Sequence, residues 1–282
     1  MLTTPSPPSD VSIPTPDGLV LRGRHWARPH PRGVVIVAHG FGEHGGCYRH
    51  VAEALGPALE VDFVAPDLRG HGRSPGRRGV VGRYEELTSD LRAATAWVES
   101  ERPGLPRFVL GHSNGGQVAL RLALEDGDGP AGLILSNPSL HIVVPVPRYK
   151  LRIGRFLLRF APGVTLAGKV ADDWMTRDPE MRREHRLDAL RHSRISAPLF
   201  FGMVEGGPLI EGRAGEIRVP VLMLLGGSDP VIDANASRRI FARLGSLDKT
   251  LIVYPEMLHE PLNELGRERV FADVASWLEG RL

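Results

Sequence analysis

The chain has 282 residues, of which 42% are hydrophobic and 24% are charged, and its formal net charge is +2. This is the composition of a globular protein, and no stretch approaches the roughly 18 uncharged apolar residues that a membrane-spanning helix needs. The positive charge is nearly all arginine and is spread along the chain. A nucleic-acid groove needs clustered cations, so the sequence argues against one.

A single cysteine, Cys47, excludes an internal disulfide framework and a metal site built from clustered cysteines. Residues 1–10 are rich in proline and serine and are predicted to form a mobile arm. This start has no basic segment followed by an apolar one, so it does not resemble a secretory signal. Together these observations favour a cytoplasmic protein.

Residues 11–27 are predicted to form a β-hairpin. The stretch VSIPTPDGLVLRGRHWA holds two short strand-like segments around Asp17-Gly18, and Asp-Gly supplies the positive φ that a hairpin turn favours.

From Gly33 onward, short apolar runs alternate with longer segments of helical periodicity. Uniformly apolar short runs are typical of parallel strands covered on both faces. Their alternation with helices predicts a doubly wound α/β sheet. The runs are GVVIVAHG, VDFVAPD, RFVLGHS, AGLILSNPS, VPVLMLLGGSD and KTLIVYPE.

Between Pro138 and Arg218 this alternation stops. We predict a mostly helical cap over residues 138–217, lying at the carboxyl edge of the strands, where open α/β sheets place their sites. A long insertion at that edge indicates a lid. Residues 11–137 and 218–282 then form the core.

The stretch GHSNGG places Ser113 between a predicted strand, RFVL, and a predicted helix, QVALRLALE. In a Gly-x-Ser-x-Gly elbow the serine hydroxyl stands above the sheet, and glycines two positions away avoid a collision of Cβ atoms. A phosphate loop is the alternative, but the spacing fits neither G-x-x-x-x-G-K-[ST] nor G-x-G-x-x-G. The context therefore predicts that Ser113 is a nucleophile.

A serine nucleophile needs a base and an orienting carboxylate, which follow this elbow in the order acid, then histidine. Asp229 ends one apolar run and His259 follows the next. Because the ends of parallel strands share one edge of the sheet, we expect both residues to meet Ser113 there. Asp233 is the nearest rival acid, but it is expected to lie in the following helix.

An oxyanion needs N–H donors that are already in place, one from the residue after the nucleophile and one from a loop near the first parallel strand. Asn114 and Phe41 occupy these two positions.

Taken in order, these motifs resemble those of the α/β-hydrolases of the monoacylglycerol lipase and lysophospholipase group, often labelled serine aminopeptidase-like. The resemblance covers nearly the whole chain and implies an α/β-hydrolase fold and a serine ester hydrolase that uses neither metal nor cofactor. The stretches that carry it are HGFGEHGGCY, DLRGHGRSPGRRG, GHSNGG, LLGGSDPVID and HEPLNE.

The resemblance implies the same triad and the same oxyanion donors. It also implies that Glu43 and His44 lie near the pocket of the leaving alcohol. Cys47 is expected to be a small packing residue or part of the pocket wall rather than a nucleophile. The chain departs from the family pattern at Asn114, where methionine or glutamine is usual, and at Cys47, where arginine is frequent. The polar loop DLRGHGRS is expected to brace the site, since buried polar groups need internal hydrogen bonds.

Residues 148–160, RYKLRIGRFLLRF, alternate cations with apolar residues at helical spacing. We expect a cap helix that covers the active site with its apolar face and turns its arginines outward. The alternative is a helix that lies on an anionic membrane surface, which would make the protein peripheral at membranes.

The sequence therefore predicts hydrolysis of a small lipid-like ester of medium or long acyl chain, monoacylglycerol foremost. A short-chain carboxylesterase or a lysophospholipase is the alternative within the enzymes, because a fold does not fix a substrate. A non-catalytic binding module would need a broken triad, and no triad position is broken here.

Overall fold

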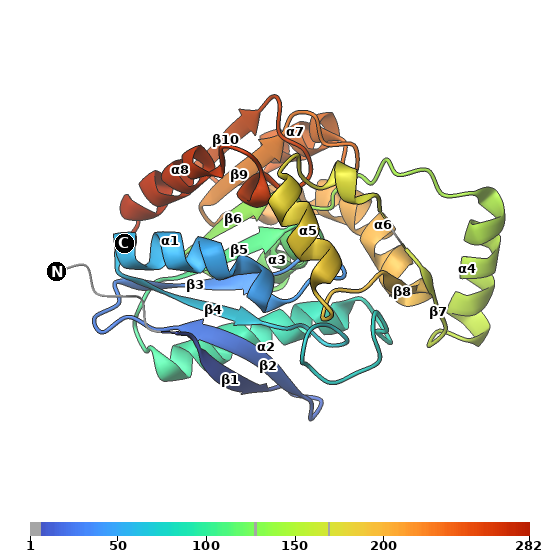
Figure 1. The fold of residues 1–282 in the computed structure, drawn as a ribbon, viewed down its shortest axis with the longest axis horizontal. Coiled ribbons are helices and arrows are strands. Elements are labelled where there is room, and N and C mark those ends of the chain that lie inside the picture. The colour runs from blue at the N-terminus through green and yellow to red at the C-terminus, as the bar shows by residue number, and fades with distance from the viewer. Residues whose placement is uncertain (1–6, 127–128, 169) are drawn as a thin grey trace.

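The computed structural model describes residues 7–126, 129–168 and 170–282. An eight-stranded sheet runs through the molecule in the order β1-β2-β4-β3-β5-β6-β9-β10 (Figure 1). From β4 to β10 the neighbouring strands are parallel, which confirms the predicted α/β-hydrolase architecture. These strands are β3 (Gly33–Ala38), β4 (Val61–Pro66), β5 (Arg107–His112), β6 (Gly132–Ser136), β9 (Val221–Gly226) and β10 (Lys249–Tyr254).

An antiparallel hairpin forms the other end of the sheet, from β1 (Ser9–Pro14) and β2 (Val20–Trp26), and β2 pairs antiparallel with β4. The hairpin begins earlier than the composition indicates. Ser9 and Asp10 fall in the predicted arm, yet they pair with β2. Backbone hydrogen bonds to a neighbouring strand outweigh the polar composition there. Residues 1–6 of the predicted arm lie outside the described part of the chain.

Helices cover both faces of the sheet, which explains why strands such as β3, β4 and β9 are buried along their whole length. One face packs on α1 (Arg49–Leu59) and α8 (Arg267–Glu279). The other packs on α2 (Glu85–Glu101), α3 (Asn114–Glu125), α6 (Ala197–Arg213) and α7 (Ala234–Arg243).

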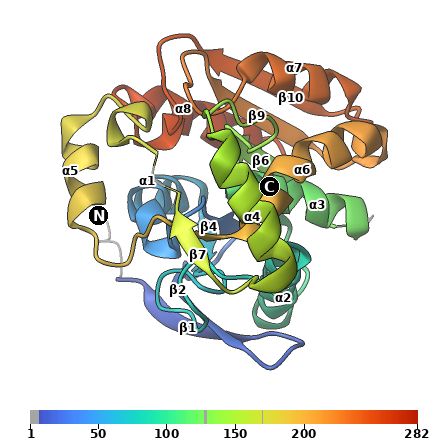
Figure 2. The same cartoon turned by 90° about the vertical axis from the view of Figure 1, so that its right-hand side faces the viewer.

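The cap segment, residues 138–217, lies between β6 and β9 and divides into two parts. Helix α4 (Arg148–Phe160) and the short strand β7 (Thr165–Ala167) stand away from the sheet, and Figure 2 shows them in front. Helix α6 instead packs on α3, where Gln117 Nε2 donates to the Met203 carbonyl oxygen at 2.9 Å. Along the chain, α5 (Pro179–Leu187) and β8 (Arg194–Ser196) come between these two parts, and β8 pairs with β7.

Candidate active site

The turn from β5 to α3 holds Ser113 in a strained conformation, with φ 50° and ψ −117°. A side chain at Gly111 would come within 2.7 Å of the Gly115 carbonyl oxygen, and one at Gly115 would overlap the Ala38 carbonyl oxygen. The turn can therefore form only with small residues on both sides of the serine. Such backbone strain persists only where the surrounding structure holds the residue in place, and it is typical of active sites.

Ser113, His259 and Asp229 come together at the carboxyl edge of the sheet. The Ser113 hydroxyl donates to His259 Nε2 at 2.9 Å, and His259 Nδ1–H donates to Asp229 Oδ2 at 2.8 Å. The other carboxylate oxygen, Asp229 Oδ1, accepts from the N–H groups of Val231 and Ile232 at 2.7 and 3.1 Å. The acid is thus held in place by the loop after β9, and it orients the histidine.

The electrostatics of His259 favour proton uptake. Burial lowers its pKa, but the Asp229 carboxylate outweighs burial, with Glu260 and Glu43 acting in the same direction, so the pKa lies above its ordinary value. His259 is therefore suited to accept the proton of the Ser113 hydroxyl.

Asp233, the alternative candidate for the triad acid, caps a helix instead. Its side chain accepts from the Asn235 N–H at 2.9 Å and caps the start of α7. The structure places it in the helix cap rather than beside His259.

The two predicted oxyanion donors are held by buried contacts. Asn114 is the first residue of α3, so its N–H has no partner within the helix. Its side chain points into the protein, where Asn114 Oδ1 accepts from the Tyr84 hydroxyl at 2.7 Å. The Phe41 ring packs edge-on against His71 and His192, at 6.5 and 5.9 Å between centroids.

A cavity of about 550 Å³ opens onto Ser113 and His259, and its lining holds an apolar group and a polar group of side chains, which we call its apolar side and its polar side. The apolar side includes Ile142, Leu151, Leu157, Ile195, Phe200 and Met203. The polar side includes Glu43, His112, His185, Asp188, Arg191 and Glu260, and the charged residues Lys150, Asp172 and Arg186 also line the cavity.

Arg191 joins the two buried carboxylates of the polar side. Its Nη1 lies 3.3 Å from Glu43 Oε1, and its Nη2 lies 3.6 Å from Glu260 Oε1. Burial raises the pKa of Glu43, but Arg191 and then His112 more than offset this, so the pKa lies below its usual range. Glu43 is therefore held as a carboxylate beside the Arg191 guanidinium, which also contacts Glu260.

His112, the residue before Ser113, lines the cavity. Its ring lies 5.0 Å from that of His259, and its Nδ1–H donates to the Ser136 carbonyl oxygen at 3.0 Å. Burial lowers the pKa of His112, which keeps the ring neutral.

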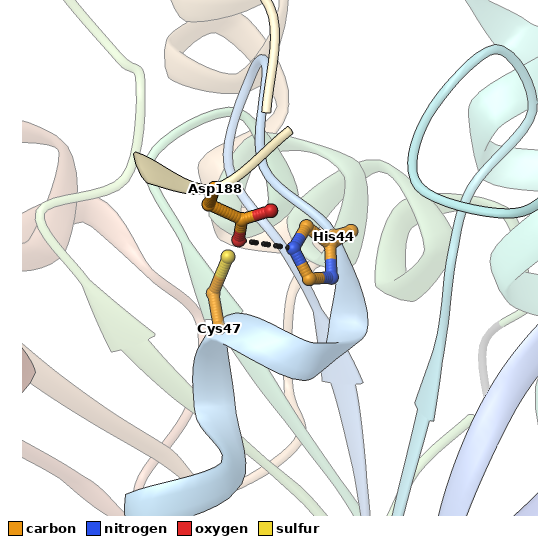
Figure 3. A group of neighbouring side chains, drawn as sticks. All are labelled: His44, Cys47 and Asp188. Carbon is orange, nitrogen blue, oxygen red and sulfur yellow. Dashed lines mark hydrogen bonds and ion pairs between the residues drawn. The ribbon is translucent and has the colours of Figure 1, made fainter. Parts of the chain in front are cut away.

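Of the three residues expected at the leaving alcohol, only Glu43 lines the cavity. His44 and Cys47 do not line the cavity, and Figure 3 shows both beside Asp188. Asp188 and Arg191, which contacts Cys47, line the cavity in their place. The loop between α5 and β8 brings in these side chains over a long sequence separation. The local pattern around Cys47 could not indicate that.

Within the described residues, two groups of three side chains have the spacing of metal ligands. In the first, His44 Nε2–H donates to Asp188 Oδ2 at 2.6 Å, and Nδ1 accepts from the Gly46 N–H at 3.1 Å. A metal on Nε2 would require a proton on Nδ1, which would then face the Gly46 N–H. In the second, Glu43 and Glu260 already share the guanidinium of Arg191. Both groups fit hydrogen-bonded contacts better than metal sites.

The polar loop after β4 is braced internally. Asp67 accepts from the N–H groups of Gly45 and Arg73, each at 2.8 Å, and Arg69 pairs with Asp90 at 2.6 Å. These contacts hold the loop against the segment that carries Glu43, and none of them reaches Ser113.

Sequence reasoning did not identify four residues of the polar side: His185, Asp188, Arg191 and Glu260. Glu260 lies in the motif HEPLNE beside His259, which is a signal that could have been used. His185 and Arg191 lie in an arginine-rich stretch where single residues carry no distinguishing pattern.

Comparisons with known proteins agree with this geometry. The family described as "Serine aminopeptidase, S33" matches residues 29–266. The chain is 34% identical over 253 residues to a monoacylglycerol lipase of Mycolicibacterium smegmatis, covering 89% of this chain and 90% of that protein. It is 30% identical over 275 residues to human monoglyceride lipase, covering 94% and 88%. A crystal structure of a monoacylglycerol lipase from Paleococcus ferrophilus matches with a TM-score of 0.84 at 30% identity, covering 93% of this chain and 99% of that one.

Proposed function

The chain belongs to the serine aminopeptidase S33 family of α/β-hydrolases and is a serine ester hydrolase, and we propose that its substrate is a monoacylglycerol of medium or long acyl chain. The observation that carries this proposal is the lining of the cavity at Ser113, which combines an apolar group of side chains with a polar one. An ester with a hydrocarbon tail and a small hydroxylated alcohol matches both sides.

In the proposed reaction, His259 takes the proton of the Ser113 hydroxyl, and the serine oxygen attacks the ester carbonyl carbon. The N–H groups of Phe41 and Asn114 donate hydrogen bonds to the carbonyl oxygen and stabilise the negative charge that develops on it. When the tetrahedral intermediate collapses, the C–O bond to the alcohol breaks and His259 returns the proton to the leaving oxygen. A water molecule, activated by His259, then releases the fatty acid from Ser113.

The apolar side of the cavity supports an acyl chain of more than a few carbons. Its wall comes from α4, α6 and the loop after β6, and each methylene buried there contributes about 0.8 kcal/mol. A short-chain ester would leave most of this surface without a partner.

The polar side supports a neutral alcohol over a phosphate-bearing one. Glu43 and Glu260 can accept hydrogen bonds from hydroxyl groups, and Arg191 can donate them. Two carboxylates face one guanidinium, so a phosphate group would meet excess negative charge with little water to screen it. This observation disfavours the lysophospholipase alternative.

The surface of α4 supports contact with membranes, where such substrates reside. Tyr149, Phe156 and Phe160 are 61%, 60% and 65% exposed, which differs from the expectation that the apolar face covers the active site. Only one side of the helix, with Leu151 and Leu157, lines the cavity. The outer side combines aromatic residues with Arg148, Arg152, Arg155 and Arg159, which suits an anionic lipid surface. No helix among the described residues is long and apolar enough to cross a membrane.

The experiment that tests the proposal compares initial rates of the purified protein on three ester classes. The panel holds monoacylglycerols, lysophospholipids and p-nitrophenyl esters, with acyl chains of roughly two to sixteen carbons. We expect kcat/KM to be highest for monoacylglycerols and to rise with chain length. Preference for the lysophospholipids or for the shortest esters would refute the proposed substrate. Failure to react with a fluorophosphonate probe would favour a binding module instead.

A further inference from the structure

The cap segment contacts both loops that carry the candidate catalytic groups, and it does so through adjacent residues of one loop. Arg191 contacts Glu43 in the segment after β3, and the N–H of His192 donates to the Gly42 carbonyl oxygen at 3.0 Å. Arg191 also contacts Glu260, the residue that directly follows His259. The loop between α5 and β8 is thereby tied to the loop of Phe41 and to the loop of His259.

We propose that Arg191 is a positioning residue of the ester-cleaving site, which balances the charges of Glu43 and Glu260 and so sets the basicity of His259. The side chain is 17% exposed and its carboxylate partners are 4% and 3% exposed, so solvent screens these charges weakly. Arg191 acts through its two partners and makes no contact with Ser113.

The direction of the electrostatic effect follows from the charges around the imidazole. Glu43 and Glu260 both raise the pKa of His259. The guanidinium of Arg191 opposes them because it is a positive charge next to both carboxylates. Without Arg191, the two carboxylates would stabilise protonated His259 more strongly. The other titratable groups around this cluster include Asp229, His39, His44, His112, His185, Asp188, Cys47 and Tyr48.

The contact between Arg191 and Glu43 also affects the oxyanion loop. Glu43 Oε2 accepts from the Gly40 N–H and from the Tyr48 hydroxyl, each at 2.8 Å, which fixes the backbone directly before Phe41. An unpaired Glu43 would be free to take up a proton or to turn toward solvent, and Phe41 would lose its fixed position.

The test is the pH profile of kcat/KM for p-nitrophenyl butyrate with Arg191→Met, which keeps much of the side-chain volume and removes the charge. The activity requires neutral His259, so its acid limb marks the pKa of that residue. We expect the limb to move to higher pH by about half a unit to one unit, so that activity falls by roughly threefold to tenfold at pH values below the limb and little above it.

Two further variants separate charge from folding. Arg191→Met combined with Glu260→Gln removes one charge of each sign, and we expect its acid limb to return to the wild-type position. Arg191→Lys keeps the charge, and we expect it to keep the limb while lowering kcat, because one ammonium group cannot span both carboxylates. Arg183→Met is the matched control, since Arg183 lies on the outer surface of α5 in an exposed pair with Glu180.

An unchanged acid limb in folded Arg191→Met protein would overturn the proposal, as would a double variant whose limb stays with that of Arg191→Met. If Arg191→Met does not fold, the double variant and Arg191→Lys still give the comparison. The inference rests on the ester-hydrolase activity alone and uses a soluble ester. If the Arg191 proposal fails, the proposal that monoacylglycerol is the substrate is unaffected. If monoacylglycerol is rejected as the substrate, the proposed role of Arg191 is unaffected.

Discussion

Helices α3 and α4 are nearly equal in length, at 12 and 13 residues, yet they differ in burial. The first eleven residues of α3 are all buried, whereas in α4 only Gly154 is. Helix α3 carries Ser113 at its start, and neighbours on every side fix its place. Helix α4 forms one wall of the cavity and presents the rest of its surface to solvent. We infer that α3 fixes the geometry of the reaction and that α4 determines how substrate reaches it.

The largest expected effect is on the α3 side. Ser113→Ala removes the attacking oxygen, and we expect kcat/KM on every ester to fall by about 10⁴-fold or more. Fluorophosphonate labelling should be lost while circular dichroism is unchanged. Ser100→Ala, at an exposed position of α2, is the control and should keep full activity. Residual labelling of the Ser113→Ala protein would mean that another group is the nucleophile.

Asp229→Asn comes next, with an expected loss of about 10⁴-fold in kcat. The amide cannot stabilise protonated His259 as the carboxylate does, so the pKa of His259 falls. Because activity requires the neutral ring, the acid limb of the remaining activity should move to lower pH. A limb at the wild-type position in this variant would contradict the assigned role of Asp229.

On the α4 side the effect should depend on the physical state of the substrate. Replacing Tyr149 and Phe156 by serine should lower the rate on monoacylglycerol in anionic vesicles by roughly fivefold to tenfold, because apolar area available for insertion is lost. The rate on a soluble p-nitrophenyl ester should stay within about twofold.

The matched control for this experiment is Leu247→Ser, which removes a fully exposed apolar side chain before β10. Vesicle sedimentation gives a second readout, in which only the α4 variant should lose binding. Equal losses on vesicles and on the soluble ester would show that the substitutions disturb the cavity rather than membrane contact.

The smallest effect on rate is expected for Asn114→Met. The backbone N–H that would serve the oxyanion is unaltered, so kcat should change by less than about tenfold. Stability should change more, since the Tyr84 hydroxyl loses its buried partner at a cost of about 1–3 kcal/mol.

Adding Tyr84→Phe removes the unpaired hydroxyl and should recover most of the lost Tm of Asn114→Met. A drop in kcat beyond about a hundredfold would instead assign the Asn114 side chain a part in the reaction.

The parts that the sequence predicts well are those governed by local rules. The elbow is recognisable from Gly111, Ser113 and Gly115, because only small residues fit around a serine at positive φ. Parallel strands are recognisable because both of their faces must be apolar. Asp229 follows from the order of the motifs and from the shared edge of the strands.

The polar wall could not be predicted, because its contacts span large separations in sequence. Arg191 lies nearly 150 residues from Glu43, and nothing in the pattern around either residue points to the other. The orientation of α4 could not be predicted for another reason. Apolar residues occur on both flanks of this helix, so periodicity alone does not decide which flank meets the cavity.

Two helices, α4 and α6, line the cavity, but only α6 packs on α3. The two helices are therefore held against the core to different degrees. Amide hydrogens of α6 should exchange with solvent only through large, rare openings that also disturb α3, whereas those of α4 should exchange through small local ones. The free energy of local opening is therefore lowest at the wall formed by α4. We therefore expect substrate to enter beneath α4 while the backbone around Ser113 keeps its strained conformation.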